Sequence, residues 1–220
     1  MKISIFGLGY VGTVCGACLA REGHTIIGVD VDASKVAAIN SGLSPVVEPE
    51  LNSLIQKGAE LQRFNATISA ADAVHNSEIS LVCVGTPSLA NGSPNFTYLE
   101  RVCKEIGLAL RTKRTSHVVA LRSTMRPGTT EDRLIPILEK HSGKRAGEEF
   151  GVCYNPEFLR EGSSVHDFFK PPTIVIGEND ERNGDLLLQL YESVKAPTIR
   201  TSIRVAEMVK YTDNAFHALK

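Results

Sequence analysis

The chain has 220 residues, of which 42% are hydrophobic and 22% are charged, and its formal net charge is −1. This composition is typical of a soluble globular protein, and the length suits one large domain or one domain with a piece of a second. The near-neutral charge gives no basis for a nucleic-acid or anionic-membrane partner. No apolar run approaches the roughly 20 residues that a membrane-spanning helix needs.

The first thirty residues contain an ordered set of signals. Lys2–Phe6 is predicted to form a buried strand, and it leads directly into the G-x-G-x-x-G sequence of Gly7–Gly12. A helix is predicted over 10–21, and a second strand, Thr25–Val29, is followed at once by Asp30. Strand, glycine turn, helix, strand and acidic residue in this order form the dinucleotide-binding fingerprint. A glycine-rich turn that binds nothing is the alternative, and the matched context makes it the weaker one.

Each residue of this fingerprint has a physical role. Gly7 permits a tight turn, Gly9 lets a pyrophosphate approach the backbone, and Gly12 lets the helix pack closely on the sheet. The free N–H groups at the helix start then face the phosphate charge. Asp30 would accept hydrogen bonds from a ribose diol and, together with Asp32, would repel a 2′-phosphate. The sequence therefore predicts that the cofactor is NAD rather than NADP.

Strands and helices alternate along the rest of the chain. Strands are predicted at 66–68, 79–84, 117–121, 150–154, 173–176 and 198–200, and helices at 34–42, 49–58, 97–111, 129–141, 181–193 and 202–220. Near-continuous Val, Ile and Leu strands joined by helices indicate a parallel sheet that is covered on both faces. The predicted fold class is therefore α/β, with a doubly wound, mostly parallel, Rossmann-like sheet.

Polar residues follow three of the predicted strands, where such sheets bind their ligands. Thr86 comes after strand 79–84, Thr124 comes after strand 117–121, and the polar segment 155–162 comes after strand 150–154. Turns alone would explain Ser, Thr, Gly and Pro at these places. Two threonines on one rim favour contact with a cofactor.

The last predicted helix carries a polar stripe. Glu207, Lys210, Asn214 and His217 fall at i, i+3, i+7 and i+10, which places them on one helix face. A solvated helix face is the ordinary interpretation of such a stripe. The apolar periodicity continues up to Lys220 with no capping residue, so we expect the helix to continue beyond this sequence.

Five segments together resemble the UDP-glucose/GDP-mannose dehydrogenase family: Ile5–Gly12, Val84–Pro87, Arg122–Thr124 with Pro127–Thr129, Asn155–Glu161 and Ala206–Asn214. Within the family, residues 46–49 and the run 142–144 leading into 150–152 are more similar to the GDP-mannose branch than to the UDP-glucose branch. The resemblance implies NAD-dependent oxidation of the C6 alcohol of a nucleotide sugar, here GDP-mannose to GDP-mannuronate, for polysaccharide precursor synthesis. UDP-glucose oxidation and a non-catalytic NAD-binding module are the alternatives.

The resemblance also implies roles for individual residues. It implies cofactor contacts from Gly7, Gly9, Tyr10, Val11 and Gly12 in the pyrophosphate turn, from Asp30 and Lys35 on the adenosine side, and from Thr86 and Thr124 at the rim. It implies catalytic roles for Thr124, Glu157, Lys210 and Asn214, and substrate contacts from Glu161, Lys210, Asn214 and His217. Family members pair through a connecting helix, so a homodimer or higher oligomer is expected of the full-length protein.

The chain departs from the family in its cysteines. Family members use a cysteine nucleophile in a Gly-Ser-Cys-like motif beyond the connecting helix, and none of the five cysteines here lies in such a motif. We therefore expect residues 1–200 to form the NAD-binding domain and residues 201–220 to begin the connecting helix. This chain should bind NAD without completing the four-electron oxidation.

A cysteine pair and a Y-x-x-x-K pattern are also present, and both favour structural roles. Cys15 and Cys18 form a C-x-x-C pair, but no second pair completes a metal site, so buried thiols are expected and no metal is predicted. Free thiols without an export signal favour the cytoplasm. Tyr191 and Lys195 form the Y-x-x-x-K pattern of short-chain dehydrogenases, yet Tyr191 lies in an amphipathic helical pattern that favours a core or surface role.

Overall fold

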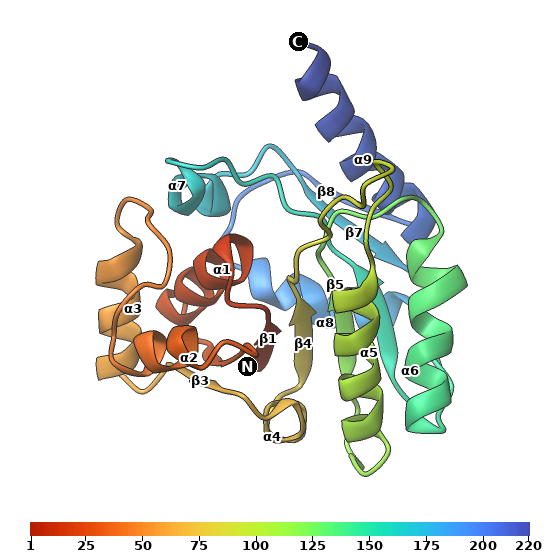
Figure 1. Cartoon of the computed structure of the whole chain (residues 1–220), viewed down its shortest axis with the longest axis horizontal. Helices are drawn as coiled ribbons and strands as arrows, with labels where there is room; N and C mark the ends of the chain where they lie inside the picture. The colour runs from red at the N-terminus through yellow and green to blue at the C-terminus, as the bar shows by residue number, and fades with distance from the viewer.

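The computed structural model describes all 220 residues and contains one eight-stranded sheet with helices on both faces (Figure 1). The strands are β1 (Lys2–Phe6), β2 (Thr25–Val29), β3 (Phe64–Thr67), β4 (Ile79–Val82), β5 (Val118–Leu121), β6 (Gly151–Tyr154), β7 (Ile174–Glu178) and β8 (Thr198–Thr201). Their order in the sheet is β3-β2-β1-β4-β5-β6-β7-β8. All neighbours pair in parallel except β6 and β7, which are antiparallel. The predicted doubly wound, mostly parallel sheet is confirmed.

Nine α-helices surround the sheet. They are α1 (Tyr10–Arg21), α2 (Ala33–Asn40), α3 (Leu51–Glu60), α4 (Ala70–His75), α5 (Thr97–Leu110), α6 (Ile135–Ser142), α7 (Ser164–Phe169), α8 (Glu181–Leu188) and α9 (Ile203–Leu219). A π-helix, η1 (Thr130–Leu134), precedes α6, and a 3₁₀ turn, η2 (Gln189–Tyr191), follows α8. The far end of α9 projects away from the body of the molecule (Figure 1).

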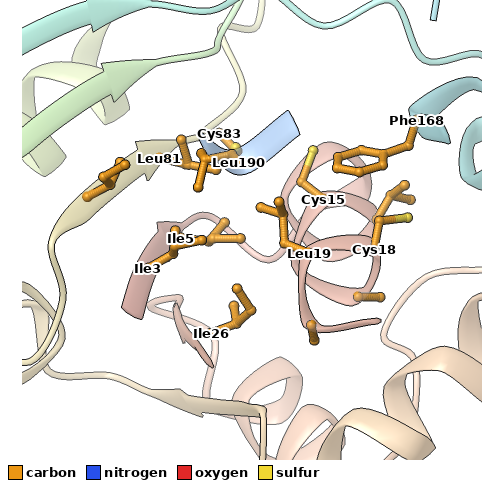
Figure 2. Packing of buried hydrophobic residues seen from close by; sticks show 14 of the residues in the cluster. Ile3, Ile5, Cys15, Cys18, Leu19, Ile26, Leu81, Cys83, Phe168 and Leu190 are labelled. Carbon is orange, nitrogen blue, oxygen red and sulfur yellow. The ribbon is translucent and has the colours of Figure 1, made fainter. Parts of the chain in front are cut away.

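Two apolar cores lie on opposite faces of the sheet because successive strand residues point to opposite sides. On β1, Ile3 and Ile5 join the core under α1, whereas Phe6 joins the core on the other face. Figure 2 shows Ile3, Ile5 and Ile26 of the strands beside Leu19 of α1. Both faces of the central strands are therefore apolar, which explains their near-continuous hydrophobic sequence.

The predicted element boundaries differ from the structure in several places. The predicted helix 129–141 is wrong in type at its start, where the π-helix η1 stands in place of α-helix. Pro136 has no backbone N–H to donate to the carbonyl four residues earlier, and the wider π-helical turn precedes it. The predicted helix 181–193 ends earlier, at Leu188, and continues as η2. The weak strand lies at Phe64–Thr67 rather than at 66–68.

Two short helices, α4 and α7, were not predicted. Each spans only six residues, which is too short for a clear helical period in the sequence. The side chain of Ser69 caps α4 by accepting a hydrogen bond from the Asp72 N–H at 3.2 Å. The sequence therefore contained the N-cap signal of α4, but the helix that follows is too short to be recognised by its periodicity.

All five cysteines are buried and none forms a disulfide. Cys15 and Cys18 project from α1 into the core beside Phe168 (Figure 2). Burial raises the pKa of the Cys15 thiol, which is the opposite of what a reactive or metal-binding thiolate requires. The prediction of buried thiols is confirmed. None of the helices is both long and apolar enough to cross a bilayer.

Candidate functional site

The glycine turn between β1 and α1 forms an open cradle. Gly7 has φ +95°, a backbone conformation that side chains disfavour, and a Cβ on Gly12 would lie only 1.9 Å from the Gly7 carbonyl oxygen. At Gly9, by contrast, an added Cβ would meet nothing within 4 Å. No side chain caps the start of α1, so its first N–H groups face this open space. The cradle therefore suits an anionic group such as a pyrophosphate.

Asp30 stands at the end of β2 beside this cradle. Its carboxylate accepts hydrogen bonds from the Leu8 N–H at 2.7 Å and from the Asp32 N–H at 2.9 Å, and Lys35 Nζ lies 3.6 Å from it. These contacts fix the carboxylate against the glycine turn while leaving lone pairs for further donors. The structure thus brings Asp30 and Lys35 together next to Gly7 and Gly9.

A cleft of about 340 Å³ joins the glycine turn to the segment after β4. Gly7, Gly9, Asp30 and Lys35 line one side, and Tyr98, Arg101 and Glu105 of α5 line the other. Sequence reasoning missed the three residues of α5. Their signal was positional, because a helix that follows a parallel strand begins at the ligand-binding edge of the sheet.

The two rim threonines lie in contact. Thr86 Oγ1 donates a hydrogen bond to the carbonyl oxygen of Thr124 at 2.9 Å, which ties the segment after β4 to the segment after β5. Ser123 Oγ also donates to the Val84 carbonyl at 2.5 Å. The predicted rim is therefore a continuous hydrogen-bonded edge.

A buried polar cluster supports the start of segment 155–163, which we call the acidic loop. Arg122 Nη1 donates to the Tyr191 hydroxyl at 2.7 Å, and that hydroxyl donates to Asn155 Oδ1 at 2.6 Å. The Asn155 amide in turn donates to the Val175 carbonyl at 2.9 Å. Tyr191 is thus a buried structural residue, as expected.

An ion pair anchors the far end of the acidic loop to α7. The Arg160 guanidinium donates to both carboxylate oxygens of Asp167, at 3.0 and 2.8 Å. These hydrogen bonds lower the pKa of Asp167 to about 2, so the carboxylate stays ionised. The acidic loop is therefore held by Asn155 at its start and by Arg160 towards its end.

Glu157 and Lys210 form an ion pair between the acidic loop and α9. Lys210 Nζ lies 3.0 Å from Glu157 Oε1, and their side chains are only 6% and 12% exposed. The second oxygen of Glu157 accepts the Leu159 N–H at 2.7 Å, and the ammonium lies 5.4 Å from the centre of the Phe158 ring. Two predicted site residues that are 53 positions apart in sequence are thus brought together.

Lys210, Asn214 and His217 line a second cleft, of about 710 Å³, between α9 and the acidic loop. These three residues of the polar stripe on α9 therefore face a groove rather than an open surface. Glu161 is exposed and does not line this cleft. The structure brings three of the four predicted substrate residues together and leaves Glu161 apart from them.

Glu207, the first residue of the stripe, is fully buried and anchors α9. Its carboxylate accepts hydrogen bonds from the Gly128 N–H at 2.5 Å, the Thr130 N–H at 2.8 Å and the Thr130 hydroxyl at 2.6 Å. Burial raises its pKa despite these donors. Its spacing placed it on one helix face with Lys210, Asn214 and His217, but only the tertiary contacts show that it anchors the start of α9.

Comparison with known proteins agrees with this geometry. Residues 1–195 match the NAD-binding domain of the UDP-glucose/GDP-mannose dehydrogenase family. The chain is 52% identical over its whole length to a GDP-mannose 6-dehydrogenase of Pseudomonas savastanoi pv. phaseolicola, and 38% identical to a UDP-glucose 6-dehydrogenase of Haloferax volcanii. It covers 50% and 52% of these proteins, so it spans about half the length of the curated relatives it matches.

Solved structures give the same result. The chain superimposes with a TM-score of 0.98 and 51% identity on a ternary complex of GDP-mannose dehydrogenase from Pseudomonas aeruginosa, covering all of this chain and 50% of that one. For a UDP-glucose dehydrogenase from Pyrobaculum islandicum, the TM-score is 0.94 and the identity is 39%. This superposition covers 99% of the present chain and 50% of the other. The chain therefore belongs to the UDP-glucose/GDP-mannose dehydrogenase family, and it contains that family's NAD-binding domain.

Proposed function

We propose that this chain is the cofactor-binding half of a GDP-mannose 6-dehydrogenase, which oxidises the C6 alcohol of GDP-mannose to the carboxylate. Residues 1–200 would form the NAD-binding domain and residues 201–220 the start of a connecting helix. The observation that carries the proposal is that the glycine cradle, Asp30 and the Glu157 partner of Lys210 follow the carboxyl ends of β1, β2 and β6, in a chain 52% identical to GDP-mannose 6-dehydrogenases.

The proposed cofactor site uses residues that the structure already holds in place. Gly7, Gly9 and Gly12 and the first amides of α1 would bind the pyrophosphate, with Tyr10 and Val11 supplying the first-turn amides. Asp30 and Lys35 would bind the adenosine ribose, and the carboxylate disfavours the 2′-phosphate of NADP. Thr86 and Thr124 would contact the nicotinamide end. NAD⁺, when bound, supplies the hydride acceptor.

The proposed chemical roles follow from charge and burial. Loss of the C6 hydroxyl proton before or during hydride transfer leaves negative charge on the sugar oxygen, and a buried ammonium stabilises such charge strongly. Lys210 and the Asn214 amide would supply that stabilisation. Glu157 and Thr124 would hold the water that takes the alcohol proton. His217 would contact the substrate within the groove, and Glu161 would contact it from the exposed part of the acidic loop outside the groove.

Binding of NAD⁺ is the first test. Isothermal titration calorimetry should give a measurable heat with NAD⁺ and at least about tenfold weaker binding of NADP⁺, equal to 1.4 kcal/mol. Asp30→Ala should weaken NAD⁺ binding by a similar factor, whereas Asp72→Ala, on the exposed surface of α4, should leave it unchanged. Absence of a heat with well-folded protein would contradict the proposed cofactor site.

Turnover and substrate binding test the remainder of the proposal. Lys210→Ala should abolish any GDP-mannose binding by this chain while the circular dichroism spectrum stays native. Sustained NADH production from GDP-mannose by this chain alone would refute the proposal that it is only the cofactor-binding half of the enzyme, because the second oxidation needs a cysteine nucleophile. A bare NAD-binding module would bind NAD⁺ equally well but would not respond to GDP-mannose.

The exposed apolar residues of α9 support the proposed assembly of the full-length protein. Val205, Met208, Phe216 and Leu219 are all at least half exposed along this helix. Exposed apolar stripes of this kind are typical of helix–helix interfaces. We infer a homodimer or higher oligomer that pairs through α9, and analytical ultracentrifugation of the full-length protein would test it.

A further inference from the structure

A carboxylate outside the site residues named above connects three separate parts of the chain. Glu48 lies in the connection between α2 and α3 and is only 9% exposed. Its Oε2 accepts hydrogen bonds from the Tyr10 hydroxyl at 2.5 Å and the Gly162 N–H at 2.8 Å. Its Oε1 accepts the Ser164 N–H at 2.8 Å. A single side chain thus joins α1, the connection 41–50 and the end of the acidic loop.

The hydrogen-bond partners of Glu48 lie in two functionally distinct parts of the molecule. Tyr10 is the first residue of α1, and its backbone belongs to the open cradle beside Gly9. Gly162 lies near the end of the acidic loop, and Ser164 begins α7. The Tyr10 hydroxyl also lies 3.4 Å from the carbonyl oxygen of Arg160, within the loop itself. Glu48 therefore bridges the proposed cofactor turn and the segment that carries Glu157.

The surroundings of Glu48 hold its carboxylate firmly and in the ionised form. Burial opposes ionisation, but hydrogen bonds from Tyr10, Gly162 and Ser164 outweigh it and lower the pKa of Glu48. Two residues later, Glu50 has φ +64°, an unfavourable conformation for a residue with a side chain. A strained backbone of this kind persists only where tertiary contacts determine it.

We propose that Glu48 is a positioning residue that couples the glycine cradle to the acidic loop. The inference rests on the proposed function of the cradle as the NAD site. Filling the cradle restrains the first turn of α1, including Tyr10, and the Tyr10–Glu48 hydrogen bond passes that restraint to Gly162 and Ser164. The acidic loop, and with it the Glu157–Lys210 pair, is then held more rigidly when cofactor is present.

This coupling is separate from the packing that keeps α7 on α1. Phe168 of α7 packs in the core beside Cys15 and Cys18 of α1 (Figure 2). Replacing the Glu48 carboxylate leaves that apolar contact intact. The variants Glu48→Gln and Tyr10→Phe should therefore keep the fold while cutting the polar connection.

Hydrogen–deuterium exchange of residues 157–164, measured with and without saturating NAD⁺, tests the coupling. In the wild-type chain, NAD⁺ should slow exchange of these amides by at least about threefold. In Glu48→Gln, this ratio should fall to near one while the Kd for NAD⁺ changes by less than about threefold. In Tyr10→Phe, the ratio measured at saturating NAD⁺ should also fall to near one. The control Glu78→Gln removes a carboxylate that accepts the Lys2 N–H at the other end of the sheet, and it should behave as wild type.

The outcomes separate this inference from the proposed function. Wild-type protein that binds NAD⁺ without slowed exchange, or a folded Glu48→Gln variant that keeps the wild-type ratio, would overturn the coupling and leave the cofactor site standing. Wild-type protein that binds no NAD⁺ would overturn both. If Glu48→Gln fails to fold, Tyr10→Phe decides, because it removes one hydroxyl and leaves the carboxylate bonded to Gly162 and Ser164.

Discussion

Two glycines of the same turn should respond differently to alanine. At Gly12 the added methyl carbon would lie 1.9 Å from the Gly7 carbonyl oxygen and 3.3 Å from Cys83 Cβ. The methyl carbon and the carbonyl oxygen must move apart by about a further 1.5 Å to reach ordinary van der Waals contact. Such overpacking costs about 1–3 kcal/mol, and the better helix propensity of alanine returns up to about 1 kcal/mol. Because the obstacle is backbone, we expect Gly12→Ala to lower the free energy of unfolding by about 2 kcal/mol.

Gly9→Ala is the matched comparison. An added methyl there meets nothing within 4 Å, and the backbone at φ −77° suits alanine. Alanine is a poorer N-cap than glycine, but it also reduces the entropy of the unfolded chain, so the two effects largely offset. The free energy of unfolding should therefore stay within about 0.5 kcal/mol of wild type. The methyl would nevertheless occupy the space that a pyrophosphate needs, and NAD⁺ binding should weaken by at least about tenfold.

Urea unfolding and calorimetry of both variants check this pair of expectations. Urea unfolding followed by circular dichroism gives the stability change, provided that the m-value is unchanged. Titration with NAD⁺ gives the loss of affinity in each variant. A Gly12→Ala variant as stable as wild type would refute the packing argument. A Gly9→Ala variant with wild-type affinity would refute the assignment of the cradle.

Two further predictions concern buried charge. Lys210→Met should lower the free energy of unfolding by about 3 kcal/mol because it leaves the Glu157 carboxylate buried without its partner, and adding Glu157→Gln should restore most of the loss in urea unfolding. His117 is fully buried and bonded to Ser80, and burial lowers its pKa to about 3, so its ring is neutral in the folded state. The stability that depends on the neutral ring is intact above the unfolded pKa of 6.5 and is lost as the pH falls towards 3. Between pH 7 and pH 5 the wild type should lose about 2 kcal/mol more than His117→Gln, and equal losses would contradict the assignment.

Much of this protein could be predicted from local sequence patterns. The order of strand, glycine turn, helix and acidic residue predicted the cradle and Asp30 because each part acts through its immediate backbone. Apolar runs predicted the sheet because strands covered on both faces need apolar side chains at nearly every position. The helical period also placed Lys210, Asn214 and His217 on one face of α9.

Only the tertiary structure could show which distant residues meet. The Lys210–Glu157 pair, the Glu207 anchor on Thr130 and the Glu48 connection each join segments that are tens of residues apart. The direction of β7 was also undetermined, because an apolar strand pairs equally well in either direction. Sequence periodicity specifies the face on which a side chain lies, whereas the partner opposite that face depends on how the whole sheet and its helices pack.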